Sequence, residues 1–261
     1  MASLERLVGS SRVGSLGYCV DKGGILSEYN SSFNISQLNA YSATIPAGYF
    51  YNAWERGALP RSWRYALSID LPWYCPQITT MQAARLYGVG FVLTPAYTFG
   101  PPGSSFVSNI GDEILYRIPS SGEATLVATK NQSLIPNVDT QGEVLKVAHP
   151  NESSMTVSTS SLNPGYLRIR LTNTPGWVAT IDGKPLQLIP FDKMMLQAFI
   201  PPGNHYVTLE YWPRTFEIGL WIAGLTALGL LLLSIYLVLK RKSFWHIFTS
   251  KLPSSCPEPL K

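Results

Sequence analysis

The feature that most constrains this chain is an apolar run near its C-terminal end. The run from Ile218 to Leu239 carries no formal charge. As a helix it would cover about 33 Å, enough to cross a hydrocarbon core of about 30 Å. A buried helix of a soluble domain is rarely so long and so apolar on every face. Aromatic residues gather at the two ends of the run, namely Tyr211, Trp212, Trp221, Tyr236, Phe244 and Trp245. The sequence therefore predicts one transmembrane helix over residues 216–239, with the lipid bilayer around it.

Positive charge is concentrated directly after this run. The chain has 20 Lys and Arg and 16 Asp and Glu, and the tail 240–261 holds five of the former and one of the latter. Residues 1–239 are therefore balanced, at 20 − 5 = 15 basic and 16 − 1 = 15 acidic side chains. This balance gives no support for a nucleic-acid partner. Under the positive-inside rule, the tail is expected to be cytoplasmic and the rest extracytoplasmic at the plasma membrane.

The start of the chain leaves two alternatives for this topology. The residues that follow Met1 lack the apolar core of a signal peptide. Either upstream membrane spans of a longer protein export the polar portion, or the chain is tail-anchored and its head stays in the cytoplasm. The first alternative is the leading expectation.

The polar portion changes character between about Thr129 and Ser161, where polar clusters are typical of loops. Before this point we expect a small α/β domain over residues 1–129. Short helices are predicted at 47–54 and 80–87, and Thr79 or Thr80 can cap the second. Strands are predicted at 90–94 and 114–118, because these segments are rich in β-branched and aromatic residues. Residues 130–161 are expected to form a linker region.

After the boundary, apolar residues alternate with polar ones. In the segment 166–171, Leu167 and Ile169 fall on one face and Arg168 and Arg170 on the other, which predicts a strand with one solvated side. Asp182-Gly183 is typical of a tight hairpin. Further strands are predicted at 177–181, 186–189, 194–200 and 206–211. The sequence thus predicts an α+β fold: the small α/β domain, an antiparallel β-sandwich over 162–215 with Trp177 in its core, and one C-terminal transmembrane helix.

Cysteine and histidine usage does not indicate a metal or cofactor. Cys19 and Cys75 could form a disulfide outside the cytoplasm, or remain two buried thiols. The three histidines are far apart in sequence and lack neighbouring partners, so we expect no metal site and no cofactor.

The candidate ligand site is an aromatic and basic stretch between residues 49 and 74. Sugars present C–H faces to aromatic rings and hydroxyls to polar side chains, and arginines bind phosphate. We therefore expect glycan or phosphate contacts from Trp54, Arg61, Trp63, Arg64, Asp70 and Trp73. The alternative is that these rings fill the core of a small domain. Glu55 and Asp70 give only weak evidence of a carboxylate pair, and no catalytic residue is predicted.

Several motifs carry a family resemblance. They are Asn173-Thr174-Pro175-Gly176-Trp177, Ile181-Asp182-Gly183-Lys184, residues 199–205 and residues 208–211, followed abruptly by the span. Together they resemble the C-terminal end of bacterial YfhO-type membrane proteins, and residues 38–42 and 86–94 resemble the region just upstream. Such proteins are similar to C-type glycosyltransferases, which take sugars from lipid-phosphate donors. In that family the catalytic acid lies in an early loop between membrane helices.

The resemblance implies an extracytoplasmic portion that supports lipid-linked glycosyl transfer but lacks the catalytic loop, so whether this chain is an enzyme stays open. The implied partners are other transmembrane helices, which a stripe of Gly219, Ala223 and Ala227 would admit, and a glycan or lipid-linked sugar. The alternatives are a non-catalytic binding or scaffold module and the tail-anchored protein.

Overall fold

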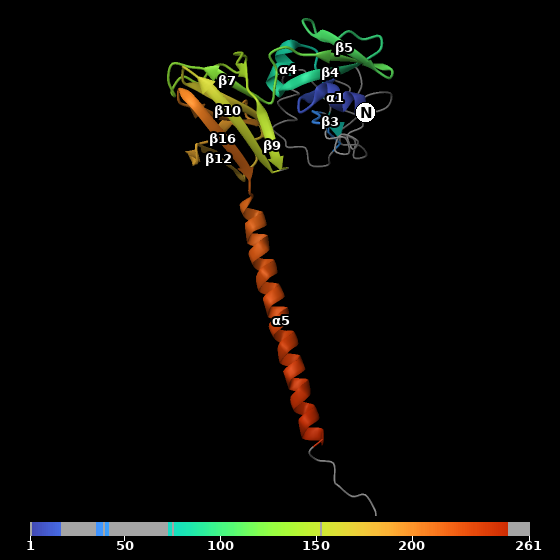
Figure 1. The fold of residues 1–261 in the computed structure, drawn as a ribbon, viewed down its shortest axis with the longest axis vertical. Helices are drawn as coiled ribbons and strands as arrows, with labels where there is room; N and C mark the ends of the chain where they lie inside the picture. The colour runs from blue at the N-terminus through green and yellow to red at the C-terminus, as the bar shows by residue number, and fades with distance from the viewer. Residues whose placement is uncertain are drawn as a thin grey trace, which may run out of the picture. The chain divides into compact units, whose positions relative to one another are not determined.

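The structure is a computed structural model that describes residues 2–16, 35–38, 40–41, 73–74, 76–151 and 153–249. The chain divides into two compact units, Met1–Tyr211 and Trp212–Lys261. Figure 1 shows the first unit as two lobes: an N-terminal lobe that contains α1, α4, β4 and β5, and a β-sandwich that contains β7, β10, β12 and β16. The α+β fold expected from the sequence is confirmed.

The N-terminal lobe is built on a four-stranded sheet with strand order β1-β4-β6-β5. Strands β1 and β4 are parallel, and the other pairs are antiparallel. A two-stranded ladder of β2 and β3 completes the described strands of this lobe. The elements are α1 (Ala2–Val8), β1 (Arg12–Ser15), β2 (Ala40–Tyr41), β3 (Trp73–Tyr74), α4 (Met81–Tyr87), β4 (Val89–Pro95), β5 (Ser105–Ile110) and β6 (Glu113–Arg117). Every residue of β4 is buried, as expected of a strand covered on both faces.

Several predictions for this lobe are confirmed. Strands β4 and β6 lie where strands were predicted, and helix α4 occupies the second predicted helix. Thr80 caps α4, because its side chain accepts a hydrogen bond from the backbone N–H of Ala83 at 3.1 Å. Ala84 and Leu86 point into the core. The helix predicted at 47–54 lies outside the described residues.

Gly88 ends helix α4 in the left-handed conformation, with φ of 68°. A Cβ at this position would lie 2.7 Å from the carbonyl oxygen of Gly122 and 2.9 Å from Cγ of Arg170. We expect Gly88→Ala to lower the free energy of unfolding by about 1 to 3 kcal/mol, measured by chemical denaturation. Gly111→Ala is the matched control, because Gly111 has φ of 61° but open space around it. Equal losses in the two variants would contradict the close approach.

The second lobe is a sandwich of two five-stranded sheets, with strand orders β13-β12-β16-β10-β9 and β14-β15-β11-β7-β8. Its strands are β7 (Ala124–Ala128), β8 (Glu143–Val144), β9 (Val147–Asn151), β10 (Ser154–Ser161), β11 (Gly165–Thr172), β12 (Trp177–Ile181), β13 (Lys184–Leu186), β14 (Ile189–Phe191), β15 (Met195–Ile200) and β16 (Gly203–Tyr211). Apolar residues of both sheets fill one core, including Met155, Leu167, Ile169, Leu196, Val207 and Leu209. This is the antiparallel sandwich that the period-two pattern predicts.

Two details of the sandwich differ from expectation. It begins at β7, and the range 130–161, expected to be a linker, contains β8, β9 and β10. Trp177 is only half-buried: its ring covers the edge of the core and lies 5.1 Å from the ring of Tyr211. The predicted hairpin at Asp182-Gly183 is confirmed, because both residues have positive φ, at 48° and 78°.

The two lobes share a second core. Apolar residues of α4 and β4 pack with Phe191, Met194 and Met195 of the sandwich in one cluster. Buried contact of this kind makes the N-terminal lobe and the sandwich one body, in agreement with the single unit that spans Met1–Tyr211.

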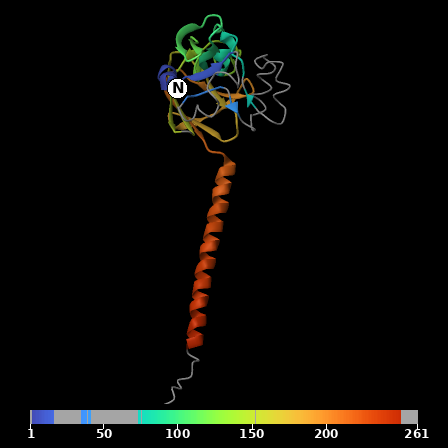
Figure 2. The same cartoon turned by 90° about the vertical axis from the view of Figure 1, so that its right-hand side faces the viewer.

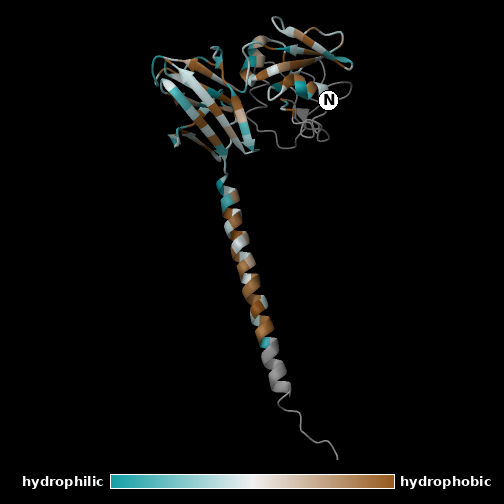
Figure 3. Cartoon of the chain, in the orientation of Figure 1, coloured by the Kyte–Doolittle hydropathy of each residue, from teal (hydrophilic) through white to brown (hydrophobic). Residues whose placement is uncertain are grey.

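The second unit contains one continuous helix, α5 (Arg214–Thr249), visible in both ribbon views (Figures 1 and 2). Its segment Arg214–Lys240 is long and apolar enough to cross a membrane, with a mean hydropathy of 2.4 in its most apolar window. Figure 3 shows that most of the visible ribbon of this segment has the colour of hydrophobic residues. Glu217 lies in the first turn, where a negative charge complements the helix dipole.

Candidate functional site

The binding residues predicted from the sequence fall where the structure gives no side chains. Trp54, Arg61, Trp63, Arg64 and Asp70 lie outside the described residues. The backbone of Trp73 is described, and it pairs with Tyr41 in the ladder of β2 and β3. Cys19 and Cys75 also lie outside, so the glycan site and the disulfide stay predictions.

The described residues reveal a different polar centre, built on strand β11. The prediction that Arg168 and Arg170 face solvent is wrong, because only 1% of Arg168 and 4% of Arg170 is exposed. The terminal nitrogens of Arg168 donate hydrogen bonds at 2.7 to 3.1 Å to the backbone carbonyls of Pro136, Asn137, Val138 and Thr140. One buried guanidinium therefore fixes a loop that has no secondary structure of its own.

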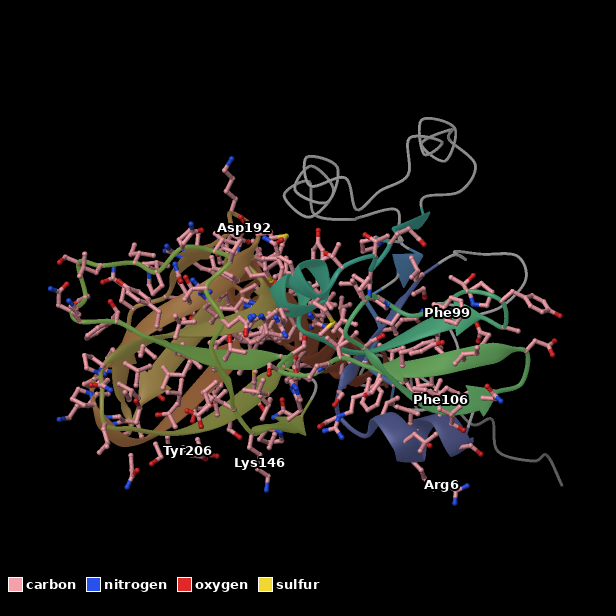
Figure 4. All side chains as sticks on the ribbon, turned by 90° about the horizontal axis from the view of Figure 1, so that it is seen from above. Arg6, Phe99, Phe106, Lys146, Asp192 and Tyr206 are labelled. Carbon is pink, nitrogen blue, oxygen red and sulfur yellow. The ribbon has the colours of Figure 1, made fainter. Side chains whose placement is uncertain are left out.

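The charge of Arg168 is balanced by its surroundings. The guanidinium carbon lies 4.6 Å from the centre of the Phe191 ring, a favourable cation–π position. Burial lowers the pKa of Arg168 to about 10, while the negative charges of Asp139 and of Asp192, labelled in Figure 4, oppose this shift. Arg168 thus stays charged at neutral pH.

Arg170 performs a related task for helix α4. The last four carbonyls of a helix have no partner within it and must be satisfied from outside. Arg170 donates from Nη2 to the carbonyl of Arg85 at 3.1 Å and from Nε to that of Leu86 at 3.4 Å. Arg12 donates to the carbonyl of Tyr87 at 2.9 Å. Two arginines therefore dock the C-terminal end of α4 onto the sandwich, where positive charge also complements the helix dipole.

An ionic cluster lies beside this junction. Glu123, just before β7, accepts a hydrogen bond from Nε2 of His149 at 2.9 Å and lies 3.7 Å from Nη2 of Arg12. Arg12 also donates to the carbonyl of Arg170 at 3.0 Å. The side chains of Glu123 and Arg12 are only 11% and 13% exposed, so this cluster is shielded from solvent more than a surface ion pair is.

The sequence shows no sign of partners for the histidines, but His149 and His205 each pair with a carboxylate. His149 pairs with Glu123, and Nδ1 of His205 lies 2.7 Å from the carboxylate of Asp182. Asp182 also accepts a hydrogen bond from the backbone N–H of Tyr206 at 2.8 Å. Within the described residues, no group of three or more His, Cys, Asp or Glu side chains is placed to hold a metal ion.

A pocket of about 370 Å³ opens between α4, the fixed loop and β11. Its lining is rich in groups that donate and accept hydrogen bonds, including Gln82, Arg85, Asp139, Thr140, Gln141 and Arg170. One carboxylate among several donors can bind a polar ligand, but it offers no pair of acids for catalysis. The pocket is thus a candidate binding site.

Residues 123–223 match the model of a family described as bacterial membrane protein YfhO. Over this segment the chain is similar to YfhO membrane proteins. No curated protein and no solved structure matches the chain. The YfhO segment runs from Glu123 through the whole sandwich into the first turns of α5, and it includes Arg168, Arg170 and His149. The family description and the apolar helix together indicate membrane association.

The charges at this junction predict a pH dependence of stability. The hydrogen bond to Glu123 raises the pKa of His149 against partial burial. Burial alone would raise the pKa of Glu123, but the hydrogen bond from His149 and the charge of Arg12 lower it. The stabilisation from His149 is complete below its ordinary value of 6.5 and is lost as pH rises through the folded pKa. The stabilisation from Glu123 is complete above its ordinary pKa of 4.5 and is lost as pH falls through its lowered folded pKa.

We therefore expect the pair of His149 and Glu123 to stabilise the sandwich more at about pH 5.5 than at about pH 8.5. Urea unfolding of the chain and of His149→Gln at both pH values measures the contribution. The variant should lose part of the difference between the two conditions. An identical pH dependence in both proteins would show that the pair contributes nothing.

Proposed function

We propose that this chain is the membrane-anchored, extracytoplasmic portion of a YfhO-type protein that supports the transfer of lipid-linked sugars in the cell envelope. The observation that carries this proposal is the continuity of the YfhO segment, which joins the sandwich directly to the apolar helix α5. The family match thus covers the sandwich and the first turns of the span together. The basic residues Lys240, Arg241 and Lys242 after the span favour a cytoplasmic tail.

In this proposal the chain does not supply the catalytic acid. C-type sugar transfer needs a carboxylate at the membrane surface that activates an acceptor hydroxyl. The acids closest in sequence to the span are Glu210 and Glu217. Glu210 is exposed on β16, and Glu217 lies in the first turn of α5, where complementing the helix dipole is a sufficient role.

Sidedness can be tested with single cysteines in intact cells. One variant carries Leu162→Cys, at a position that is 97% exposed in the sandwich, with Cys19, Cys75 and Cys256 replaced by Ser. The matched variant keeps only Cys256 in the tail. An impermeant thiol reagent should label the first variant directly and the second only after permeabilisation. The reverse pattern would support the tail-anchored alternative with a cytoplasmic head.

The supporting role can be tested by complementation. Cells that lack this chain should lose a sugar modification of the envelope, and the wild-type chain and Glu217→Gln should restore it equally. The purified chain in lipid should not turn over a polyprenyl-phosphate sugar. Turnover by the purified chain, abolished by Glu217→Gln, would refute the non-catalytic assignment.

A further inference from the structure

The pocket between α4, the fixed loop and β11 is held open by buried arginines. Strand β7 ends at Ala128 and β8 begins at Glu143, so the chain between them is a long loop without secondary structure. Long loops of this kind in compact domains are usually functional. Arg168 fixes four carbonyls of this loop, and Arg170 fixes the facing end of α4. A ligand would therefore meet walls that are already ordered, which removes part of the entropic cost of binding.

The lining has one basic group that is not fully occupied. Arg85 is half-buried, and among the described residues its side chain makes one hydrogen bond, from Nε to the carbonyl of Pro119 at 3.4 Å. Among the described residues, its two terminal nitrogens donate no hydrogen bond and can therefore bind a ligand. The planar fork of a guanidinium suits a carboxylate or a phosphate, which it can bind through two parallel hydrogen bonds.

The rest of the lining suits hydroxyl groups. Gln82, Gln141 and Thr140 can each both donate and accept, and Asp139 can accept from a ligand hydroxyl. Arg85 and Arg170 outnumber Asp139, so the lining carries one net positive charge. A volume of about 370 Å³ is at the small end of the range of ligand pockets, which is about 300 to 1,000 Å³.

We propose that this pocket binds a small hydroxylated anion, whose carboxylate or phosphate pairs with Arg85 and whose hydroxyls contact the amide and carboxylate side chains of the lining. Arg168 and Arg170 are positioning residues, because they hold the walls through backbone carbonyls. Binding at this pocket does not require that the sandwich be extracytoplasmic or that the chain take part in sugar transfer. The pocket can therefore be tested independently of the proposed function.

Titration calorimetry of the full chain in detergent tests the ligand class with four probes: glucuronate, glucose 6-phosphate, glucose and inorganic phosphate. Glucuronate and glucose 6-phosphate should bind, and glucose should bind at least about tenfold more weakly, because it lacks the charge-assisted hydrogen bonds to Arg85. Inorganic phosphate should also be weaker than glucose 6-phosphate. Equal binding of glucose would overturn the anion requirement, equal binding of phosphate would overturn the hydroxyl contacts, and no binding of either anionic hexose would overturn the site.

Substitutions locate the binding residue. Arg85→Gln should weaken binding of glucuronate by about ten- to a hundredfold, and Arg85→Lys should recover only part of the loss, since an ammonium cannot form the paired hydrogen bonds. Arg117→Gln is the control, because Arg117 is exposed on β6 and does not line this pocket. Thermal unfolding of each variant separates loss of binding from loss of folding. Unchanged affinity in a folded Arg85→Gln protein would overturn the assignment.

Discussion

Replacement of Arg170 by Met should lower the free energy of unfolding by about 3 to 5 kcal/mol, the cost of removing one partner from a buried charged network. Methionine fills a similar volume, but it cannot donate to the carbonyls of Arg85 and Leu86. Within the described part of the chain, the carbonyl of Arg85 would keep only its bond from the backbone N–H of Gly88, at 3.3 Å. The side chain is 4% exposed, so water cannot easily replace it.

Chemical denaturation followed by tryptophan fluorescence measures this loss. Arg117→Met, at an exposed position on β6, is the matched control and should change the unfolding free energy by less than about 0.5 kcal/mol. Equal shifts in the two variants would mean that the docking of α4 does not depend on the guanidinium.

Replacement of Leu230 by Arg should release the chain from membranes. Leu230 lies near the middle of the apolar segment of α5, and an arginine at the centre of a span opposes insertion by about 2.5 to 3.5 kcal/mol. Carbonate extraction separates integral from peripheral protein, so the variant should move into the soluble fraction. Leu230→Ala serves as the control and should stay in the membrane pellet. Retention of the arginine variant with unchanged topology would contradict a role of this helix as the span.

The sequence predicts the parts of this fold that depend on local patterns. Thr80 and Gly88 end helix α4 as caps do, Asp182-Gly183 forms the expected hairpin, and the length of the apolar run predicts the span. Each of these features depends on a few neighbouring residues and on backbone preferences that the chain carries with it. The motifs around Trp177 correctly indicate the likeness to YfhO proteins, whose family model matches residues 123–223.

The candidate site could not be predicted in the same way, because it depends on contacts between distant segments. The alternation of apolar and basic residues in β11 predicts a strand, but it does not predict which segments cover the second face of that strand. That face is covered by the loop at 136–140 and by α4, roughly 30 and 85 residues away in sequence. The charges of Arg168 and Arg170 do not predict their burial, because backbone carbonyls accept hydrogen bonds from both guanidinium groups. The ring of Phe191 stacks on Arg168, but the sequence alone does not show that these two residues meet.

The contacts between α4 and the sandwich limit where this chain can be truncated without loss of folding. A piece that starts at Glu123 would keep the YfhO segment but lose the carbonyls of α4 and the apolar partners of Phe191, Met194 and Met195. Such a truncated sandwich should aggregate or unfold in part. The first unit is thus expected to behave as one cooperative unit of folding, with a single unfolding transition. A destabilising change in the N-terminal lobe should therefore reduce the amount of folded sandwich, although that lobe lies outside the family segment.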